Sequence, residues 1–109
     1  MLGAAGLGDI GKHFPDDQEK YRNINSRELL IQVREKISRL NYKLSNADLT
    51  IVAQQPKMAP HLTAMISNLA ADLACDTGQL NIKATTTEHL GYLGRKEGIA
   101  VHAVVLIEQ

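Results

Sequence analysis

Two polar stretches of the chain combine residue types that suit phosphate and metal chemistry. Lys83–Gly98 reads KATTTEHLGYLGRKEG, and Gly8–Asp16 reads GDIGKHFPD. Each places small, hydroxyl-bearing and charged residues in a predicted loop between apolar segments, which is how rigid elements commonly hold a binding site. The run Thr85–Thr87 supplies hydroxyl and backbone N–H donors before a predicted helical turn, and Glu88 supplies an oxygen of the kind that Mg²⁺ prefers. The pattern therefore favours a site for a phosphorylated ligand and a divalent cation.

Charged residues nearby suit the same chemistry, although each also has an ordinary structural explanation. Lys57, Lys83 and Arg95 can neutralise phosphate charge, while Asp9 and Asp16 can accept hydrogen bonds from sugar hydroxyls. Threonines at the end of a strand also occur through β-propensity and capping, and aspartates often form turns. Taken one at a time, each of these residues favours the structural explanation.

The remaining metal-binding residue types form no recognisable cluster in the sequence. The four histidines are far apart and show no zinc-binding spacing: His13, His61, His89 and His102. The single cysteine, Cys75, follows an apolar helical pattern, and we expect it to be a buried small hydrophobe rather than a reactive thiol. One cysteine also excludes an internal disulfide.

Length and composition restrict the class of protein. The 109 residues predict a single small domain, 1–109, with 12 basic and 12 acidic residues in balance. Balanced charge and only 4% aromatic residues argue against a nucleic-acid partner, and no apolar run reaches membrane-spanning length. We therefore expect neither nucleic acid nor a membrane as partner.

Periodicity predicts a mixed α/β (α+β) fold, a small sheet with helices on one side. Apolar residues at helical spacing predict helices after Asn25 and after Pro60, and strands are predicted at Asp48–Gln54 and at residues 80–85. The nearly continuous apolar run Ile99–Ile107 predicts a central or interface strand that is buried on both faces. The apolar start of the chain lacks a capping residue and is typical of the last turns of a helix whose beginning is missing.

The order of several motifs is more specific than any one of them. GDIGKHFPD, SRELL, TIVAQQPKMAPH and NIKATTTEHLGYLGRKEGIAVHAV follow one another along the chain. Together they closely resemble the 2-C-methyl-D-erythritol 2,4-cyclodiphosphate synthase family, and the resemblance covers essentially all 109 residues. The resemblance implies a lyase of the non-mevalonate (methylerythritol phosphate) route of isoprenoid and terpenoid biosynthesis. Its substrate would be 4-diphosphocytidyl-2-C-methyl-D-erythritol 2-phosphate, whose 2-phosphate attacks the β-phosphate and releases CMP.

The resemblance also assigns roles to particular residues. Thr86 would stabilise the transition state, and Glu88 would bind a magnesium-type ion. The other implied contacts are all to substrate. They come from Asp9, Ile10, Gly11, Phe14, Pro15, Asp16, Asp17, Gln18, Ala53, Gln54, Gln55, Pro56, Lys57, Met58, Ala59, Thr85, Thr87, Tyr92 and Arg95.

Cofactors and assembly follow from the same resemblance. Family members use two divalent metals, a zinc-type ion and a magnesium- or manganese-type ion, and form homotrimers whose sites lie between subunits. The family's N-terminal third, with its zinc-type ligands, has no counterpart in these residues, so the chain corresponds to the C-terminal two-thirds of the domain. We therefore expect little or no cyclase activity from this polypeptide alone. The alternatives are a non-catalytic module that binds cytidine nucleotides and a trimeric structural α/β protein. The family is compatible with bacterial cytoplasm, and also with plastids.

Overall fold

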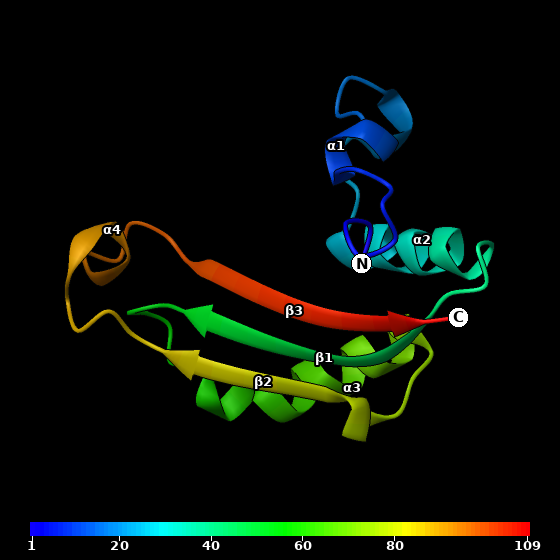
Figure 1. Ribbon diagram of the computed structural model, residues 1–109. Coiled ribbons are helices and arrows are strands. Elements are labelled where there is room, and N and C mark those ends of the chain that lie inside the picture. Colours follow the sequence, from blue (N-terminus) through cyan, green and yellow to red (C-terminus); the bar gives the residue numbers. More distant parts are fainter.

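A three-stranded sheet in the order β2-β1-β3 forms the centre of the protein, in a computed structural model that describes residues 1–109 (Figure 1). The central strand β1 (Lys43–Val52) runs parallel to β2 (Leu80–Thr85) and antiparallel to β3 (Ala100–Glu108). Helix α3 (Leu62–Leu73) provides the crossover between the two parallel strands, as such connections require. The predicted mixed α/β class is therefore confirmed.

Local contacts and backbone geometry explain where the first long helix begins and where the second ends. In α2 (Ser26–Ser38), the Asn25 side chain caps the first turn by accepting from the Arg27 N–H at 2.8 Å. Helix α3 follows the short 3₁₀ turn Ala59–His61 and ends at Ala74, whose φ of 52° stops the helix. The helix predicted after Asn25 is thus confirmed, and the one predicted from Pro60 begins two residues later.

The core lies between α3, α2 and one face of the sheet. Alternate residues of β1, from Ala47 to Ile51, and Ala53 just after it turn toward the helices together with Leu80 and Ile82 of β2. They pack against an apolar stripe of α3 that includes Ala70 and Leu73, while Leu30 of α2 closes one end. The half-buried pattern predicted for residues 80–85 is confirmed.

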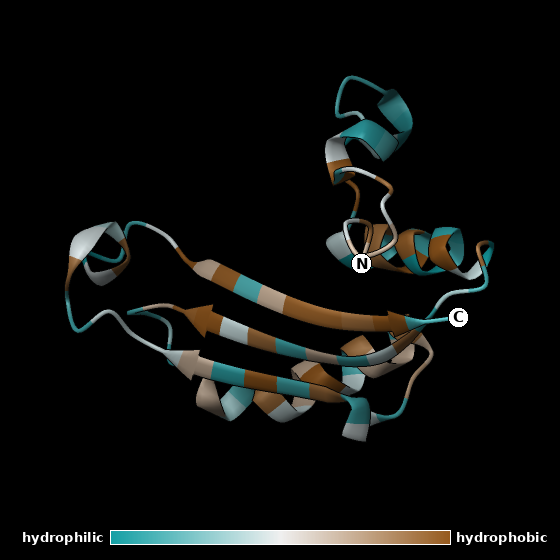
Figure 2. Ribbon diagram, in the orientation of Figure 1, coloured by the Kyte–Doolittle hydropathy of each residue, from teal (hydrophilic) through white to brown (hydrophobic).

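Strand β3 differs from its prediction, because it is an edge strand and is largely exposed. It pairs only with β1, so one of its edges is free, and Val101, Val104 and Leu106 are each more than half exposed. Burial on both faces is therefore wrong for this chain by itself. Figure 2 shows β3 as the most continuously hydrophobic strand of the sheet. The alternative, that this strand belongs to an interface, stays a prediction.

The N-terminal segment packs onto α2. Residues 2–6 form a turn in which the Ala5 N–H donates to the Met1 carbonyl at 3.1 Å, and Leu2 is buried against Phe14 and Val33. The predicted loop contains a short helix, α1 (Ile10–His13), and a 3₁₀ turn follows at Glu19–Tyr21. None of the helices combines the length and apolar character that a membrane-spanning segment requires.

Candidate functional site

The two parallel strands end at the same edge of the sheet, and their following loops form the main candidate site. Val52 and Thr85 are paired at this edge, and the Ala53 N–H donates to the Thr85 carbonyl at 3.0 Å. The chain after β1 and the chain after β2 therefore leave the sheet side by side (Figure 1). The carboxyl ends of parallel strands are a common position for ligand sites in α/β proteins.

A pocket of about 950 Å³ lies between these loops. It is lined by the whole segment Ala53–Ala59 after β1 and by residues that follow β2. The complete lining comprises Ala53, Gln54, Gln55, Pro56, Lys57, Met58, Ala59, Ala84, Thr85, Thr86 and Lys96. Nine of these residues were predicted from the sequence as substrate contacts, so the structure brings that part of the predicted set together.

The first loop is anchored to the core at both of its ends. Ala53 is buried with Ile51 and Ile82, and the half-buried Met58 packs against the same cluster. The Gln55–Pro56 peptide is cis. Between these anchors, the Gln54 Oε1 accepts from the His89 N–H of the second loop at 3.1 Å. The two walls of the pocket are therefore tied to each other directly.

The threonine run divides its hydroxyls between the pocket and the loop itself. Thr85 and Thr86 line the pocket, whereas Thr87 Oγ1 donates to the Leu90 carbonyl at 2.6 Å and fixes the turn. The Glu88 N–H donates to Thr86 Oγ1 at 3.1 Å, which holds Glu88 beside the pocket at a positive φ of 53°. The exposed Glu88 carboxylate has no ion-pair partner and is free to meet a cation.

A short helix, α4 (Gly91–Gly94), follows this turn and orients three charged residues. Arg95 Nε donates to Glu97 Oε2 at 3.1 Å, and its Nη2 forms an ion pair with the same oxygen at 3.0 Å. Arg95 does not line the pocket. Tyr92 is exposed and also lies outside the lining. Lys96 does line the pocket, although the sequence analysis did not select it. Its position next to the selected Arg95 was the only sequence signal that pointed to it.

The charged side chains that line the pocket are all positive. Its lining contains two lysines, Lys57 and Lys96, and no carboxylate. Neither lysine takes part in an ion pair. Hydroxyl donors at Thr85 and Thr86 lie in the same pocket. Unpaired cations beside hydroxyl donors suit an anionic, phosphate-bearing ligand.

Lys83, a further candidate for phosphate binding, points its charge elsewhere. Its Nζ lies 2.8 Å from Asp48 Oδ2, and Asn81 donates to the other carboxylate oxygen at 2.9 Å. The hydrogen bonds from Lys83 and Asn81 lower the pKa of Asp48 below its ordinary value. This pair lies on the exposed face of the sheet and outside the pocket lining.

The other predicted substrate residues lie far from this pocket within one chain. Asp9 caps α1 by accepting from the Lys12 N–H at 2.9 Å, and Phe14 is buried edge-to-face against Tyr21. Figure 1 shows α1 beside α2, at the opposite end of the molecule from α4. None of the predicted N-terminal contacts lines the pocket: Asp9, Ile10, Gly11, Phe14, Pro15, Asp16, Asp17 and Gln18. Their roles stay predictions.

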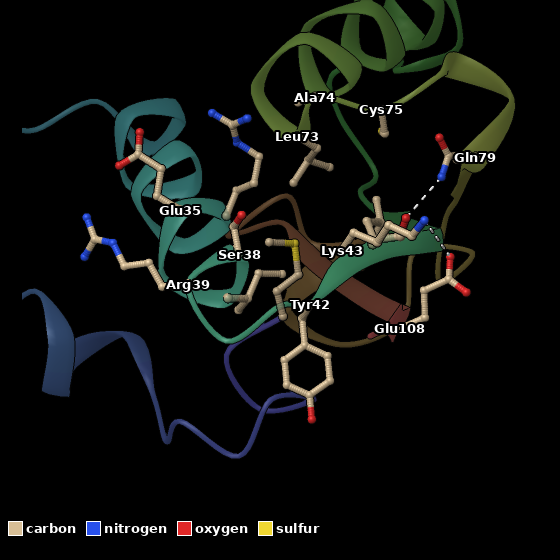
Figure 3. Close-up of a pocket in the computed structure, with 14 residues that line it drawn as sticks. Glu35, Ser38, Arg39, Tyr42, Lys43, Leu73, Ala74, Cys75, Gln79 and Glu108 are labelled. Carbon is tan, nitrogen blue, oxygen red and sulfur yellow. Dashed lines mark hydrogen bonds and ion pairs between the residues drawn. The ribbon is translucent and has the colours of Figure 1, made fainter.

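Another pocket, of about 560 Å³, lies where α2 ends and β1 begins (Figure 3). It contains Arg34, Arg39 and Glu35, together with Lys43 and Glu108, which are paired at 3.7 Å. It includes none of the predicted site residues, and its charges are of both signs. Cys75 also lines it and is half-buried rather than buried as predicted, and burial together with the nearby Asp76 charge raises the pKa of this thiol.

A small α+β domain with a pocket at the ends of two parallel strands, whose lining carries lysines and no carboxylate, is the class that this geometry defines. Comparison with known proteins is more specific, because the YgbB family model matches residues 1–108. The chain therefore belongs to the YgbB family. The family identified from the sequence motifs is confirmed by this match and by the relatives described next.

Curated relatives share the 2-C-methyl-D-erythritol 2,4-cyclodiphosphate synthase name. The protein from Pseudoalteromonas translucida is 58% identical over 109 residues, which are 100% of this chain and 66% of the relative. The protein from Cellvibrio japonicus is 56% identical over 108 residues, 99% of this chain and 68% of the relative. The chain thus spans about two-thirds of the length of these relatives.

Solved structures agree with the fold as well. The bifunctional IspDF from Campylobacter jejuni superposes with a TM-score of 0.92 at 49% identity, covering 97% of this chain and 29% of that chain. The IspF of Plasmodium falciparum, described as a CDP complex, gives a TM-score of 0.85 at 35% identity. That match covers 97% of this chain and 63% of the other.

Proposed function

We propose that this chain provides the cytidine-binding part of a 2-C-methyl-D-erythritol 2,4-cyclodiphosphate synthase. The observation that carries the proposal is the pocket between the loops after β1 and β2, which is cationic and lacks carboxylates. Two facts about relatives support it: the synthase name of curated proteins and the CDP complex of the Plasmodium falciparum protein. The substrate is 4-diphosphocytidyl-2-C-methyl-D-erythritol 2-phosphate, and the enzyme is a lyase of isoprenoid biosynthesis.

The reaction is an internal phosphoryl transfer. An oxygen of the 2-phosphate forms a bond to the β-phosphorus, the bond from that phosphorus to the bridging oxygen breaks, and CMP leaves with the electron pair. Such reactions depend on positioning and on neutralisation of charge. Backbone groups of Ala53–Ala59 bind the cytosine, Lys57 and Met58 line its pocket, and Thr86 donates to the charge that develops during transfer.

The remaining predicted contacts complete the substrate site. Thr85 and Thr87 hold phosphate and the loop around it, and Tyr92 and Arg95 supply further contacts to the substrate. The methylerythritol hydroxyls belong to Asp9, Ile10 and Gly11, with Phe14–Gln18 beside them. Because these residues lie at the other end of the same chain, they would complete the pocket of a neighbouring subunit.

The fit of the implied metals differs between the two ions. Mg²⁺ or Mn²⁺ binds well to one carboxylate plus phosphate oxygens and water, and the free Glu88 carboxylate beside Thr86 suits such an ion. When bound, this ion would neutralise diphosphate charge. A zinc-type ion does not fit, because no group of three His, Cys, Asp or Glu side chains is assembled in the structure. No step is assigned to zinc in these residues.

Titration of the purified chain with cytidine 5′-diphosphate tests this proposal. Mg²⁺ should raise the affinity by about tenfold, since charge-assisted contacts contribute roughly 1.5–3 kcal/mol each. Glu88→Gln should abolish that gain and leave the metal-free affinity unchanged, and Glu28→Gln, at an exposed position of α2, serves as a control outside the pocket lining. Isothermal titration calorimetry measures all three proteins. A folded chain without affinity for the nucleotide, at any Mg²⁺ concentration, would refute the proposal.

We propose a homotrimer, because the predicted substrate contacts lie at two ends of one chain and neighbouring subunits would bring them together. The apolar residues Val104 and Leu106 are 74% and 58% exposed on the sheet face away from the helices. Isolated apolar residues are common on surfaces, but a continuous exposed strand is typical of an interface. The bacterial relatives make bacterial cytoplasm the proposed compartment.

Light scattering coupled to size-exclusion chromatography measures the mass of the assembly and tests whether it is a trimer. We expect the mass of a trimer for the wild-type chain and a smaller species for Val104→Asp, because a buried carboxylate without a partner is strongly unfavourable. Thr63→Asp adds the same charge to an exposed position of α3 and should leave the trimer intact. A monomeric wild-type chain, or a trimeric Val104→Asp protein, would contradict the proposal.

A further inference from the structure

We infer that Lys96 determines specificity for the phosphorylated part of the nucleotide, binding a phosphoryl group next to Thr86. The inference rests on the proposed function of the pocket and adds a residue to it. Lys96 is one of only two cations in the pocket lining, and it comes from the second loop, whereas Lys57 comes from the first. The two ammonium groups therefore approach the ligand from different loops.

The charges around Lys96 leave its ammonium available. Its neighbour Arg95 is held by Glu97, with both guanidinium contacts going to the same carboxylate oxygen. Lys96 has no ion-pair partner, and no carboxylate lines the pocket that it faces. Within the sequence GRKEG, the arginine is neutralised and the lysine is the free cation. An ammonium group without a partner attracts phosphate oxygens and adds nothing for an uncharged nucleoside.

The backbone at Lys96 is fixed in a conformation that favours glycine. Its φ is 66°, its N–H donates to the Leu93 carbonyl at 3.1 Å, and the Glu97 N–H donates to the Tyr92 carbonyl at 3.0 Å. These two bonds are those of a Schellman motif, which ends α4 and usually places glycine at this residue. A side chain here costs backbone energy. The same bonds hold the start of the side chain in place beside the pocket.

Because Lys96 has a positive φ, substitutions at this position can distinguish a ligand-binding role from a structural role. If Lys96 served only the loop, then glycine would be the better residue, because it adopts positive φ without strain. Lys96→Gly should therefore keep or raise the melting temperature. It should nevertheless weaken binding if the ammonium group contacts the ligand. Lys96→Met removes the charge and keeps the length of the side chain, and Lys96→Arg keeps the charge.

Calorimetric titration of the chain with cytidine 5′-diphosphate, CMP and cytidine tests the inference. We expect Lys96→Met and Lys96→Gly to weaken diphosphate binding by about tenfold, with cytidine affinity changed by less than about twofold. Lys96→Arg should retain most of the affinity. The dependence of binding on salt concentration should also be shallower in the uncharged variants, because one charge contact is lost. Lys43→Met, at the opposite end of the sheet, is the control for loss of one positive charge.

Two results would overturn the inference. In one, Lys96→Met and Lys96→Gly bind the diphosphate as tightly as the wild-type chain does. In the other, they lose affinity for cytidine and for the diphosphate equally, which would indicate a structural role. A wild-type chain that binds neither cytidine nor its phosphates would refute the proposed function itself, and with it the role of Lys96. Normal wild-type binding with unaffected Lys96 variants would refute the role of Lys96 alone.

Discussion

Gly94→Ala is expected to remove most of the affinity of the chain for cytidine 5′-diphosphate. Gly94 is buried, and a Cβ atom there would lie 2.6 Å from the His89 Cα and 2.7 Å from the His89 carbonyl oxygen. It would overlap the His89 carbonyl carbon as well. These neighbours are backbone atoms, so the clash can be relieved only by moving the chain. Overpacking of this kind typically costs about 1–3 kcal/mol.

Displacement of His89 would reach both walls of the pocket. The His89 N–H donates to Gln54 of the first loop, and His89 lies within the turn that Thr87 and Leu90 close. A shift of the second loop would therefore separate Thr86 from the segment Ala53–Ala59. We expect a loss of affinity of at least about tenfold, since each 1.4 kcal/mol of lost positioning energy corresponds to that factor.

Calorimetric titration and thermal unfolding of Gly94→Ala measure the two effects separately. Gly78→Ala is the matched control, because no atom lies within 4 Å of a Cβ at Gly78 and its backbone is not left-handed. That variant should keep full affinity and an unchanged melting temperature. Wild-type affinity in Gly94→Ala would mean that the packing of α4 on His89 does not position the nucleotide pocket.

Local periodicity was sufficient to predict the elements whose two faces have different environments. Strand β2 alternates because one face packs on α3 and the other meets solvent. Helix α3 has a continuous apolar stripe for the same reason. The prediction for β1 began five residues too late and ended two residues too late, because the missed residues 43–47 include the exposed polar residues Lys43 and Asn46. A prediction that relies on apolar residues misses the part of a strand where polar residues occupy the exposed face.

The candidate site shows a similar limit. The motifs selected Ala53–Ala59 and Thr85–Thr86, and the structure places both on one pocket. The sequence could not show that Lys83 is paired with Asp48, or that Lys96 lines the pocket. Each depends on contacts between residues that are distant in the chain. For the same reason, the order of the motifs did not indicate that α1 and α4 lie at opposite ends of one chain (Figure 1).

Loss of the ion pair between α2 and α3 is expected to destabilise the folded chain. Arg27 donates to Asp72 through two nitrogens, at 2.8 and 3.0 Å, and joins the two helices. The Asp72 side chain is only 5% exposed, whereas that of Arg27 is 51% exposed. Removing the arginine therefore leaves a buried carboxylate poorly compensated, while removing the aspartate leaves a cation that water can solvate. We expect Arg27→Met to lower the free energy of unfolding, and Asp72→Asn to lower it by less.

The same pair predicts how stability changes with pH. The hydrogen bond from Arg27, with the charges of Arg27 and Arg34, lowers the pKa of Asp72 below its ordinary value of 3.8. A carboxyl group with a lowered pKa stabilises the folded state above its unfolded pKa, and this contribution is lost as the pH falls through the folded pKa. The difference between the wild-type chain and Arg27→Met should thus be constant near neutral pH and shrink below pH 3.8.

Urea unfolding at pH 7 and at several acidic values measures this difference. Arg34→Met is the control, because Arg34 acts on Asp72 through its charge alone and should have a smaller effect. The double variant Arg27→Met with Asp72→Leu should recover much of the lost stability, since an apolar pair can replace a buried ion pair. A double variant no more stable than Arg27→Met would show that the unpaired Asp72 carboxylate does not account for the stability lost in Arg27→Met. An equal loss from both single variants would contradict the asymmetry that their exposures predict.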